Sequence, residues 1–150
     1  MSNLDIVLKS IDLLKEDMKP DWGKMSCSQM VKHCNRFIQV YVNEVKFKTP
    51  ISLLSPIFGK LHIFWLRHII RYNVNKYFRN LPTLRYFNTY RITNINFIKE
   101  KEELAGRIKF VMDYKKNYIS NTFHGRIKSK TFKDVVEFHT KYHFTQFGVM

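Results

Sequence analysis

The sequence predicts an all-α protein that forms a single domain over residues 1–150. Apolar residues recur at helical spacing in successive segments, and several of these segments carry a helix start or stop signal. The chain has 5 Gly and 4 Pro, fewer than a loop-rich sandwich or barrel requires. Residues 80–97 alternate somewhat like a strand, but no second clear strand exists to pair with them. We therefore expect an extended loop there.

The first two helices follow from apolar spacing and a capping motif. Residues 3–17 place Leu, Ile and Val at helical spacing among acids and lysines, and this pattern ends before a turn at residues 20–23. Ser26 and Gln29 then form a capping box, in which each side chain satisfies an exposed backbone N–H group. The second helix should run from this box to about Glu44.

The third predicted helix, residues 57–79, is apolar around most of its circumference. It follows a predicted connection over residues 46–56, which contain two prolines. Lys60, Arg67 and Arg71 fall on one narrow stripe of the helix. Three interpretations fit this pattern, in order of preference: a deeply packed helix with one narrow solvent-exposed stripe, a subunit interface, and a helix on a membrane surface.

Two further helices complete the predicted fold. Residues 98–119 combine an apolar face with many outward charges. A loop over residues 120–130 should follow. Thr131 can then cap a last helix, which should stop at Gly148, a residue type that often ends helices.

The charge of the chain is strongly positive and unevenly placed. Lys and Arg number 26 against 12 Asp and Glu, a net charge of +14. Residues 45–99 contain no acidic residue and ten basic ones. Such a field attracts anionic partners. A basic, aromatic segment could bind nucleic acid, but the chain carries no nucleic-acid-binding motif, so we do not expect this partner.

The N-terminal segment and the cysteines indicate a cytoplasmic protein. Residues 1–17 combine acidic residues with no small-residue cleavage site, unlike a signal peptide. The most apolar stretch, residues 53–74, is interrupted by three basic residues, so we expect no membrane span. Cys27 and Cys34 lie two helical turns apart, too far for a disulfide, and should be small core residues.

Three histidines form a candidate metal site. His139 and His143 are four residues apart and lie within the apolar stripe of the last predicted helix. Two imidazoles facing a core are costly unless partnered. A metal would satisfy both, and so would hydrogen bonds to backbone or Tyr groups. His33, on the second helix, becomes a third ligand if the two helices pack together.

The other polar candidates are weaker. His62 and His68 should lie at the surface or at an interface of the third helix. His124 is expected in a loop, where it would make a surface hydrogen bond or reach the mouth of the site. Gln29 and Asn35 are candidates to orient the imidazoles of metal ligands.

Two motifs stand out, one toward each end of the chain. The first is Trp22-Gly23-Lys24-Met25-Ser26-x-x-Gln29-Met30-x-x-His33-Cys34-Asn35. The second is His139-x-x-x-His143-x-x-Gln146-Phe147-Gly148-Val149. Both resemble a branch of the DinB/YfiT-like metalloenzyme superfamily that is known only as a domain of unknown function. Weaker matches lie at residues 120–132, Asn80-x-Pro82-Thr83 and Phe97, so the resemblance covers most of the chain.

The resemblance implies an up-down-down-up four-helix bundle with one metal site. Its ligands would be His33, His139 and His143. The chain departs from the branch in lacking a proline after His124 and in carrying Tyr142 where a second histidine is usual. The wider superfamily includes thiol S-transferases and a thiol-dependent isomerase.

These observations predict a divalent-metal-binding protein that is a candidate enzyme of the thiol S-transferase or hydrolase type. Three imidazoles suit zinc or nickel foremost, and also accept iron or copper. Three protein ligands leave coordination positions open for a small thiol or water. An acidic substrate would be attracted by Arg67 or Arg71. The sequence singles out no catalytic residue.

Two non-enzymatic functions stay open. The first is a basic protein that binds an anionic partner, such as nucleic acid, through residues 45–99. The second is a metal-binding or dimerising stress protein without turnover. We also expect a homodimer, because the third helix is more apolar than one neighbour usually covers. A two-fold contact along it would bury Trp65 and Ile69.

Overall fold

The computed structural model describes residues 3–45 and 51–150, and within them the protein is mostly helical. Its α-helices are α1 (Asn3–Ser10), α2 (Cys27–Tyr41), α3 (Ile51–Phe64), α4 (Phe97–Asp113) and α5 (Ser129–Gln146). Shorter turns are η1 (Ile11–Leu13), the π-helical η2 (Trp65–Ile69) and η3 (Val74–Lys76). Strands β1 (Tyr118–Asn121) and β2 (Gly125–Lys128) pair antiparallel. The predicted helical character is confirmed, and this small hairpin is an addition that the sequence did not predict.

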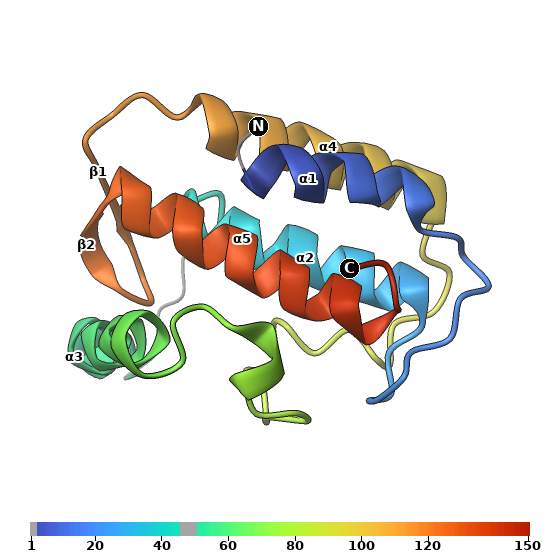
Figure 1. The fold of residues 1–150 in the computed structure, drawn as a ribbon, viewed down its shortest axis with the longest axis horizontal. Coiled ribbons are helices and arrows are strands. Elements are labelled where there is room, and N and C mark those ends of the chain that lie inside the picture. The colour runs from blue at the N-terminus through green and yellow to red at the C-terminus, as the bar shows by residue number, and fades with distance from the viewer. Residues whose placement is uncertain (1–2, 46–50) are drawn as a thin grey trace.

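Four helices lie side by side and enclose the core (Figure 1). Helices α1 and α5 run in one direction, and α2 and α4 run in the opposite one (Figure 1). Helix α3 lies to one side of this group, below the hairpin in the view of Figure 1. The connection from α2 to α4 therefore carries α3 and the long loop that follows it.

The core lies between the apolar faces of the four packed helices. Each face follows the 3.6-residue period, because apolar side chains three and four residues apart share one side of a helix. Large, fully buried core side chains are Val7, Leu14, Met30, Val31, Ile38, Tyr41, Leu104, Ile108, Phe132 and Phe144. Cys27 and Cys34 are buried as free thiols, as the sequence predicts.

The predicted signals at the ends of α2 and α5 are confirmed at two places and wrong at a third. The capping box is present: the Gln29 N–H donates to Ser26 Oγ at 3.3 Å, and the Ser26 N–H donates to Gln29 Oε1 at 2.9 Å. Gly148 follows α5 with φ of 67°, the left-handed conformation that ends helices. Thr131 is not a cap, because α5 already begins at Ser129 and Thr131 is buried within it.

The hairpin replaces the predicted loop over residues 120–130 and the predicted end of the preceding helix. Helix α4 stops at Asp113, and β1 begins five residues later. Ile119 pairs with Ile127, and both side chains are buried. The Asn121 side chain accepts the backbone N–H groups of the two residues at the hairpin tip, at 2.9 Å each. Two four-residue strands carry too little alternation to be recognised in the sequence.

The segment around α3 also differs from its prediction. Residues 51–56 are helical rather than a connection, and the rest of that predicted connection lies outside the described residues. The predicted helix over residues 57–79 ends as η2, followed by Arg71 and Tyr72 with positive φ. The interpretation of α3 as deeply packed is wrong, because several of its large apolar side chains are exposed.

Helices α1 and α2 are shorter than predicted, and the long loop has the predicted character. The first helix gives way at Ser10 to one 3-10 turn, and α2 ends at Tyr41 rather than near Glu44. Residues 77–96 form turns without a helix or strand. None of the helices in the described part of the chain combines the length and apolarity that crossing a bilayer demands.

Candidate metal centre

The three predicted histidines come together between two helices. His33 lies on α2, and His139 and His143 lie one turn apart on α5. One ring nitrogen from each lies within 4.8 Å of the other two. Nε2 of His33 is 3.2 Å from Nε2 of His139. Two imidazole nitrogens on one tetrahedral zinc, each at 2.0–2.1 Å, would be about 3.3 Å apart, so the spacing fits a shared metal ion.

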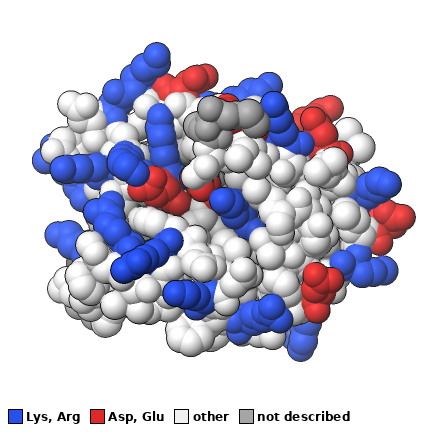
Figure 2. Space-filling view, viewed as in Figure 1, with Lys and Arg blue, Asp and Glu red and all other residues white. Residues whose placement is uncertain are grey.

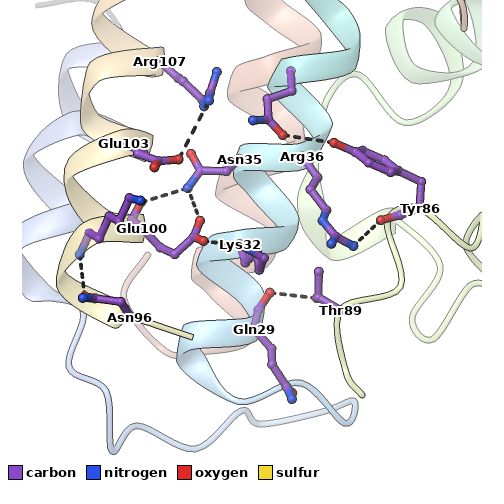
Figure 3. Close-up of polar contacts among 12 residues, drawn as sticks. Gln29, Lys32, Asn35, Arg36, Tyr86, Thr89, Asn96, Glu100, Glu103 and Arg107 are labelled. Carbon is purple, nitrogen blue, oxygen red and sulfur yellow. Dashed lines mark hydrogen bonds and ion pairs between the residues drawn. The ribbon is translucent and has the colours of Figure 1, made fainter. Parts of the chain in front are cut away.

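His33 is oriented by the long loop. Its Nδ1–H donates to the Phe87 carbonyl oxygen at 2.7 Å, which leaves the lone pair on Nε2 facing the other two histidines. The loop is held along α2 by contacts on either side of Phe87 (Figure 3). Arg36 donates to the Tyr86 carbonyl at 2.6 Å, and Thr89 Oγ1 donates to the Gln29 carbonyl at 2.8 Å. The loop therefore fixes the tautomer of His33.

His143 is oriented by a side chain from its own helix. Nδ1 of His143 lies 3.0 Å from Gln146 Oε1, while Gln146 Nε2 donates to the Trp22 carbonyl at 2.5 Å. Because the amide nitrogen faces the carbonyl, Oε1 must accept, so the proton of His143 lies on Nδ1. Gly23 has φ of 89°, and a Cβ there would lie 2.5 Å from Gln146 Nε2. The Trp22-Gly23 motif thus makes room for the residue that positions His143.

His139 lies flat against an aromatic ring of α2. Its imidazole stacks on Phe37, with ring centres 3.6 Å apart and planes 3° apart. Its Nδ1 is buried and has no hydrogen-bond partner among the described residues. A buried ring nitrogen without a partner is costly. The ring of His139 is therefore held in place by packing, and its Nδ1 makes no hydrogen bond to the described part of the protein.

The three imidazoles are held neutral, which is the form that binds metal. Burial lowers the pKa of His143 to about 3, with a further contribution from the neighbouring His33. Burial, followed by the proximity of His143 and His33, lowers the pKa of His139 well below its usual range. Burial also lowers the pKa of His33, and its bond to the Phe87 carbonyl opposes this only partly. At neutral pH all three offer lone pairs rather than charges.

The three histidines line one side of a cavity of about 800 Å³. Its walls come from α2, α3, α5, the hairpin tip and the long loop. Most of the lining is apolar or aromatic. Lys24 is the one Lys or Arg among the described lining residues, and no Asp or Glu is found among them. A site of this size accommodates a small organic molecule.

A second histidine pair, His62 and His124, lines the same cavity. Nδ1 of His62 lies 3.3 Å from Nε2 of His124, within hydrogen-bond distance. Each histidine also contacts a tyrosine hydroxyl: Tyr41 hydrogen-bonds Nδ1 of His124, and the Tyr77 hydroxyl lies 3.5 Å from Nε2 of His62. The expectation that His62 lies at the surface or an interface is wrong, since it is partly buried in the cavity wall. The alternative that His124 reaches the site is confirmed. His68 is exposed, as predicted.

Neither predicted orienting residue touches the histidines. Asn35 points from α2 toward α4, where its Nδ2 donates to the Glu100 carbonyl at 2.9 Å and to the Glu100 carboxylate at 2.8 Å (Figure 3). The Gln29 side chain donates to the carbonyls of Tyr90 and Ile92 in the long loop. Both residues hold the scaffold. Gln146, which carries out the expected role, belongs to the closing motif but was assigned no role from the sequence.

The arginines expected to attract an acidic substrate lie outside the cavity lining. Arg67 donates to Thr131 Oγ1 at 2.8 Å, and Arg71 is an exposed residue with φ of 53°. Neither contributes to the cavity wall. The attraction of an acidic substrate by these arginines therefore stays a prediction.

Comparison with protein-family models, curated proteins and solved structures gives no match to this chain. The geometry of the three histidines and of the cavity therefore carries the functional argument.

Proposed function

We propose that His33, His139 and His143 bind one divalent metal ion. The observation that carries this proposal is the convergence of three neutral imidazoles within 4.8 Å. Two of them have their Nδ1 protons held by oxygen acceptors, so each presents the other nitrogen as a ligand.

The ligand set favours zinc or nickel, and iron is also compatible. Imidazole nitrogens suit all three metals, and neither a carboxylate nor a thiolate joins the group among the described residues. The two cysteines are buried in the core, and burial raises the pKa of the Cys27 thiol to about 11, which disfavours its thiolate form. We therefore expect metal binding without a cysteine ligand.

We further propose that the protein is a metal-dependent enzyme of the thiol S-transferase or hydrolase type. A divalent cation on three imidazoles keeps open positions and lowers the pKa of a coordinated water or thiol, which supplies a nucleophile at neutral pH. The cavity beside the histidines supports this proposal, because it offers room for a second reactant. The sequence resemblance to DinB/YfiT-like proteins is the other support.

Metal analysis tests the binding proposal. Protein purified without a histidine tag, then stripped and titrated with Zn²⁺ or Ni²⁺, should bind one ion per chain. Single changes to Ala at His33, His139 or His143 should each remove most of the binding. The exposed His68→Ala is the matched control and should bind like wild type. Equal binding by wild type and His139→Ala would refute the site.

A reaction screen tests the proposed chemistry separately. The metal-loaded protein is incubated with several low-molecular-weight thiols and a chromogenic electrophile, and in parallel with chromogenic esters. Conjugation or hydrolysis faster than with His143→Ala is the expected result. Rates equal to those of the variant in both screens would leave a metal site without these two activities and would reject the enzyme proposal.

A further inference from the structure

An exposed apolar surface runs along α3 and continues past it. Ile57, Leu61 and Phe64 recur at i, i+4 and i+7 on one side of the helix, and their exposed fractions are 61%, 61% and 57%. Phe58 of α3, Ile69 of η2 and Phe78, whose ring stacks on Trp65 of η2, add to this surface, with exposed fractions of 64%, 58% and 61%. We call these six residues the α3 apolar face. Single exposed apolar residues are ordinary, but a contiguous group marks a site of interaction.

Cations border this face, and acids are missing from it. Lys60 of α3 and Arg67 of η2 are exposed, and Arg71, Lys76 and Arg79 are exposed further along the chain. The whole segment over residues 45–99 contains no acidic residue. In Figure 2, Lys and Arg side chains lie beside white surface at the edge where Figure 1 places α3, and the acidic side chains lie elsewhere. Apolar side chains flanked by cations suit the interface of an anionic bilayer.

The α3 apolar face is continuous with the mouth of the cavity. Phe58 and Phe78 belong both to this face and to the cavity lining. Leu81 and Leu84 also line the cavity, and their exposed fractions are 49% and 39%. An apolar path therefore leads from the outer surface to the wall that holds the three histidines.

We propose that the α3 apolar face docks on the surface of an anionic lipid bilayer. The apolar side chains enter the boundary between headgroups and acyl chains, while the bordering Lys and Arg side chains contact anionic headgroups. The same contact brings the cavity mouth to the bilayer, so that the apolar part of an amphiphilic molecule can enter it without crossing water. This inference is independent of the metal.

The charge of the α3 segment favours a bilayer as the partner of the α3 apolar face over a second copy of the chain, which the expected homodimer would place on this face. A two-fold contact along α3 sets the acid-free, cationic surface of one copy against the same surface of another. With a net charge of +14 on each chain, such a contact brings like charges together. Anionic headgroups instead neutralise these cations.

Vesicle flotation tests the proposal. The probes are vesicles of phosphatidylcholine alone and of phosphatidylcholine mixed equally with phosphatidylglycerol. Wild type should float with the anionic vesicles at low salt. Leu61→Ser with Phe64→Ser should bind about a hundredfold more weakly, because each change removes an apolar side chain worth about a factor of ten or more.

The matched control changes two apolar residues of comparable exposure on α4. Ile98 and Phe110 are 62% and 52% exposed on α4, a helix that lies away from α3 (Figure 1). Ile98→Ser with Phe110→Ser should bind vesicles like wild type. Circular dichroism and zinc titration of both double variants should match wild type, which separates this test from the metal proposal.

Three results would overturn the proposal. The first is the absence of wild-type binding to anionic vesicles. The second is equal binding by the α3 and α4 double variants. The third is a combination of observations: wild type sediments as a dimer and binds no vesicles, and the α3 double variant, unlike the α4 double variant, sediments as a monomer. That last result would assign the α3 apolar face to a second copy.

Discussion

At the scale of single residues, the candidate metal centre depends on the groups behind its ligands. Nδ1 of His33 hydrogen-bonds the Phe87 carbonyl oxygen, and Nδ1 of His143 hydrogen-bonds Oε1 of Gln146. His139 has no such bond among the described residues and is held by stacking on Phe37. Loss of a partner that orients a ligand commonly reduces metal affinity by about tenfold to a hundredfold. Substitution of these hydrogen-bond partners therefore tests the candidate metal centre, as substitution of the histidines does.

Substitution of Gln146 should weaken metal binding without removing a ligand. Gln146→Leu leaves Nδ1 of His143 without an acceptor and frees its ring to turn, so zinc affinity should fall by about tenfold to a hundredfold. Gln146→Glu is the comparison variant: it loses the bond to the Trp22 carbonyl but keeps an oxygen that accepts from Nδ1, so it should retain more of the affinity than Gln146→Leu. Calorimetric zinc titration measures both. Unchanged affinity in Gln146→Leu would show that this contact does not position His143.

Comparison of Gly23 with Gly148 separates the crowding of Gln146 from the general cost of placing Ala at a positive φ. Gly23 and Gly148 have φ of 89° and 67°, so Ala at either position should cost about 1–2 kcal/mol of unfolding free energy. Only at Gly23 does the added Cβ crowd Gln146, whereas at Gly148 it meets nothing within 4 Å. Gly23→Ala should therefore lower zinc affinity and Gly148→Ala should not. Denaturant unfolding with zinc titration checks this, and similar affinities in the two variants would contradict it.

At the scale of elements, one close approach sets the position of α3. Gly59 faces the tip of the hairpin, where a Cβ would overlap the Phe123 carbonyl oxygen and lie 2.7 Å from Cα of His124. The absence of a side chain lets α3 pack against the hairpin, and this contact brings His62 to His124. The hairpin, which was not predicted, thus completes one wall of the cavity.

Two helical glycines should respond oppositely to Ala. Gly59→Ala forces the helix away from the hairpin and should cost about 1–3 kcal/mol of unfolding free energy. Gly106, in α4, has open space around its Cα, so Gly106→Ala should raise the unfolding free energy by about 0.5–1 kcal/mol. Urea unfolding monitored by circular dichroism measures both changes. Destabilisation by Gly106→Ala, or none by Gly59→Ala, would contradict the packing described.

At the scale of the whole molecule, buried neutral histidines link folding to pH. Burial, together with the nearby His62, lowers the pKa of His124 from 6.5 to about 3. Above pH 6.5 this imidazole is neutral in both the folded and the unfolded chain. Below that pH the unfolded chain takes up a proton that the folded protein excludes. Stability is therefore fully present above the unfolded value and is lost as the pH falls toward the folded one.

Acidification should destabilise the metal-free protein, in part through His124. Between about pH 6 and pH 4, one such histidine contributes a slope of about 1.4 kcal/mol per pH unit to the unfolding free energy. His124→Gln removes this proton uptake and should make the dependence shallower by about that amount, whereas the exposed His68→Gln should leave the slope as in wild type. Urea unfolding across this range in the presence of a chelator measures the slopes. Equal slopes in wild type and His124→Gln would contradict the prediction.

Local features of the fold and the candidate group of three histidines were predictable from the sequence. The four-residue spacing of His139 and His143 places them on one helix face wherever that helix lies. The capping box at Ser26 and the stop at Gly148 act through hydrogen bonds and backbone angles within a few residues. Periodicity likewise predicts which helix faces are apolar. Selection of His33 as the third ligand also drew on the resemblance of two motifs to a metal-binding family.

Tertiary structure alone decided what surrounds those ligands. The carbonyl that orients His33 lies 54 residues away, and Trp22 and Gln146 are separated by 124 residues. Two short strands gain their hydrogen bonds only by pairing with each other, so neither is marked by its own pattern. The apolar circumference of α3 predicted burial, yet burial requires a neighbour on every side. Composition and spacing specify what a segment can form, while long-range packing determines which of its faces meets a partner.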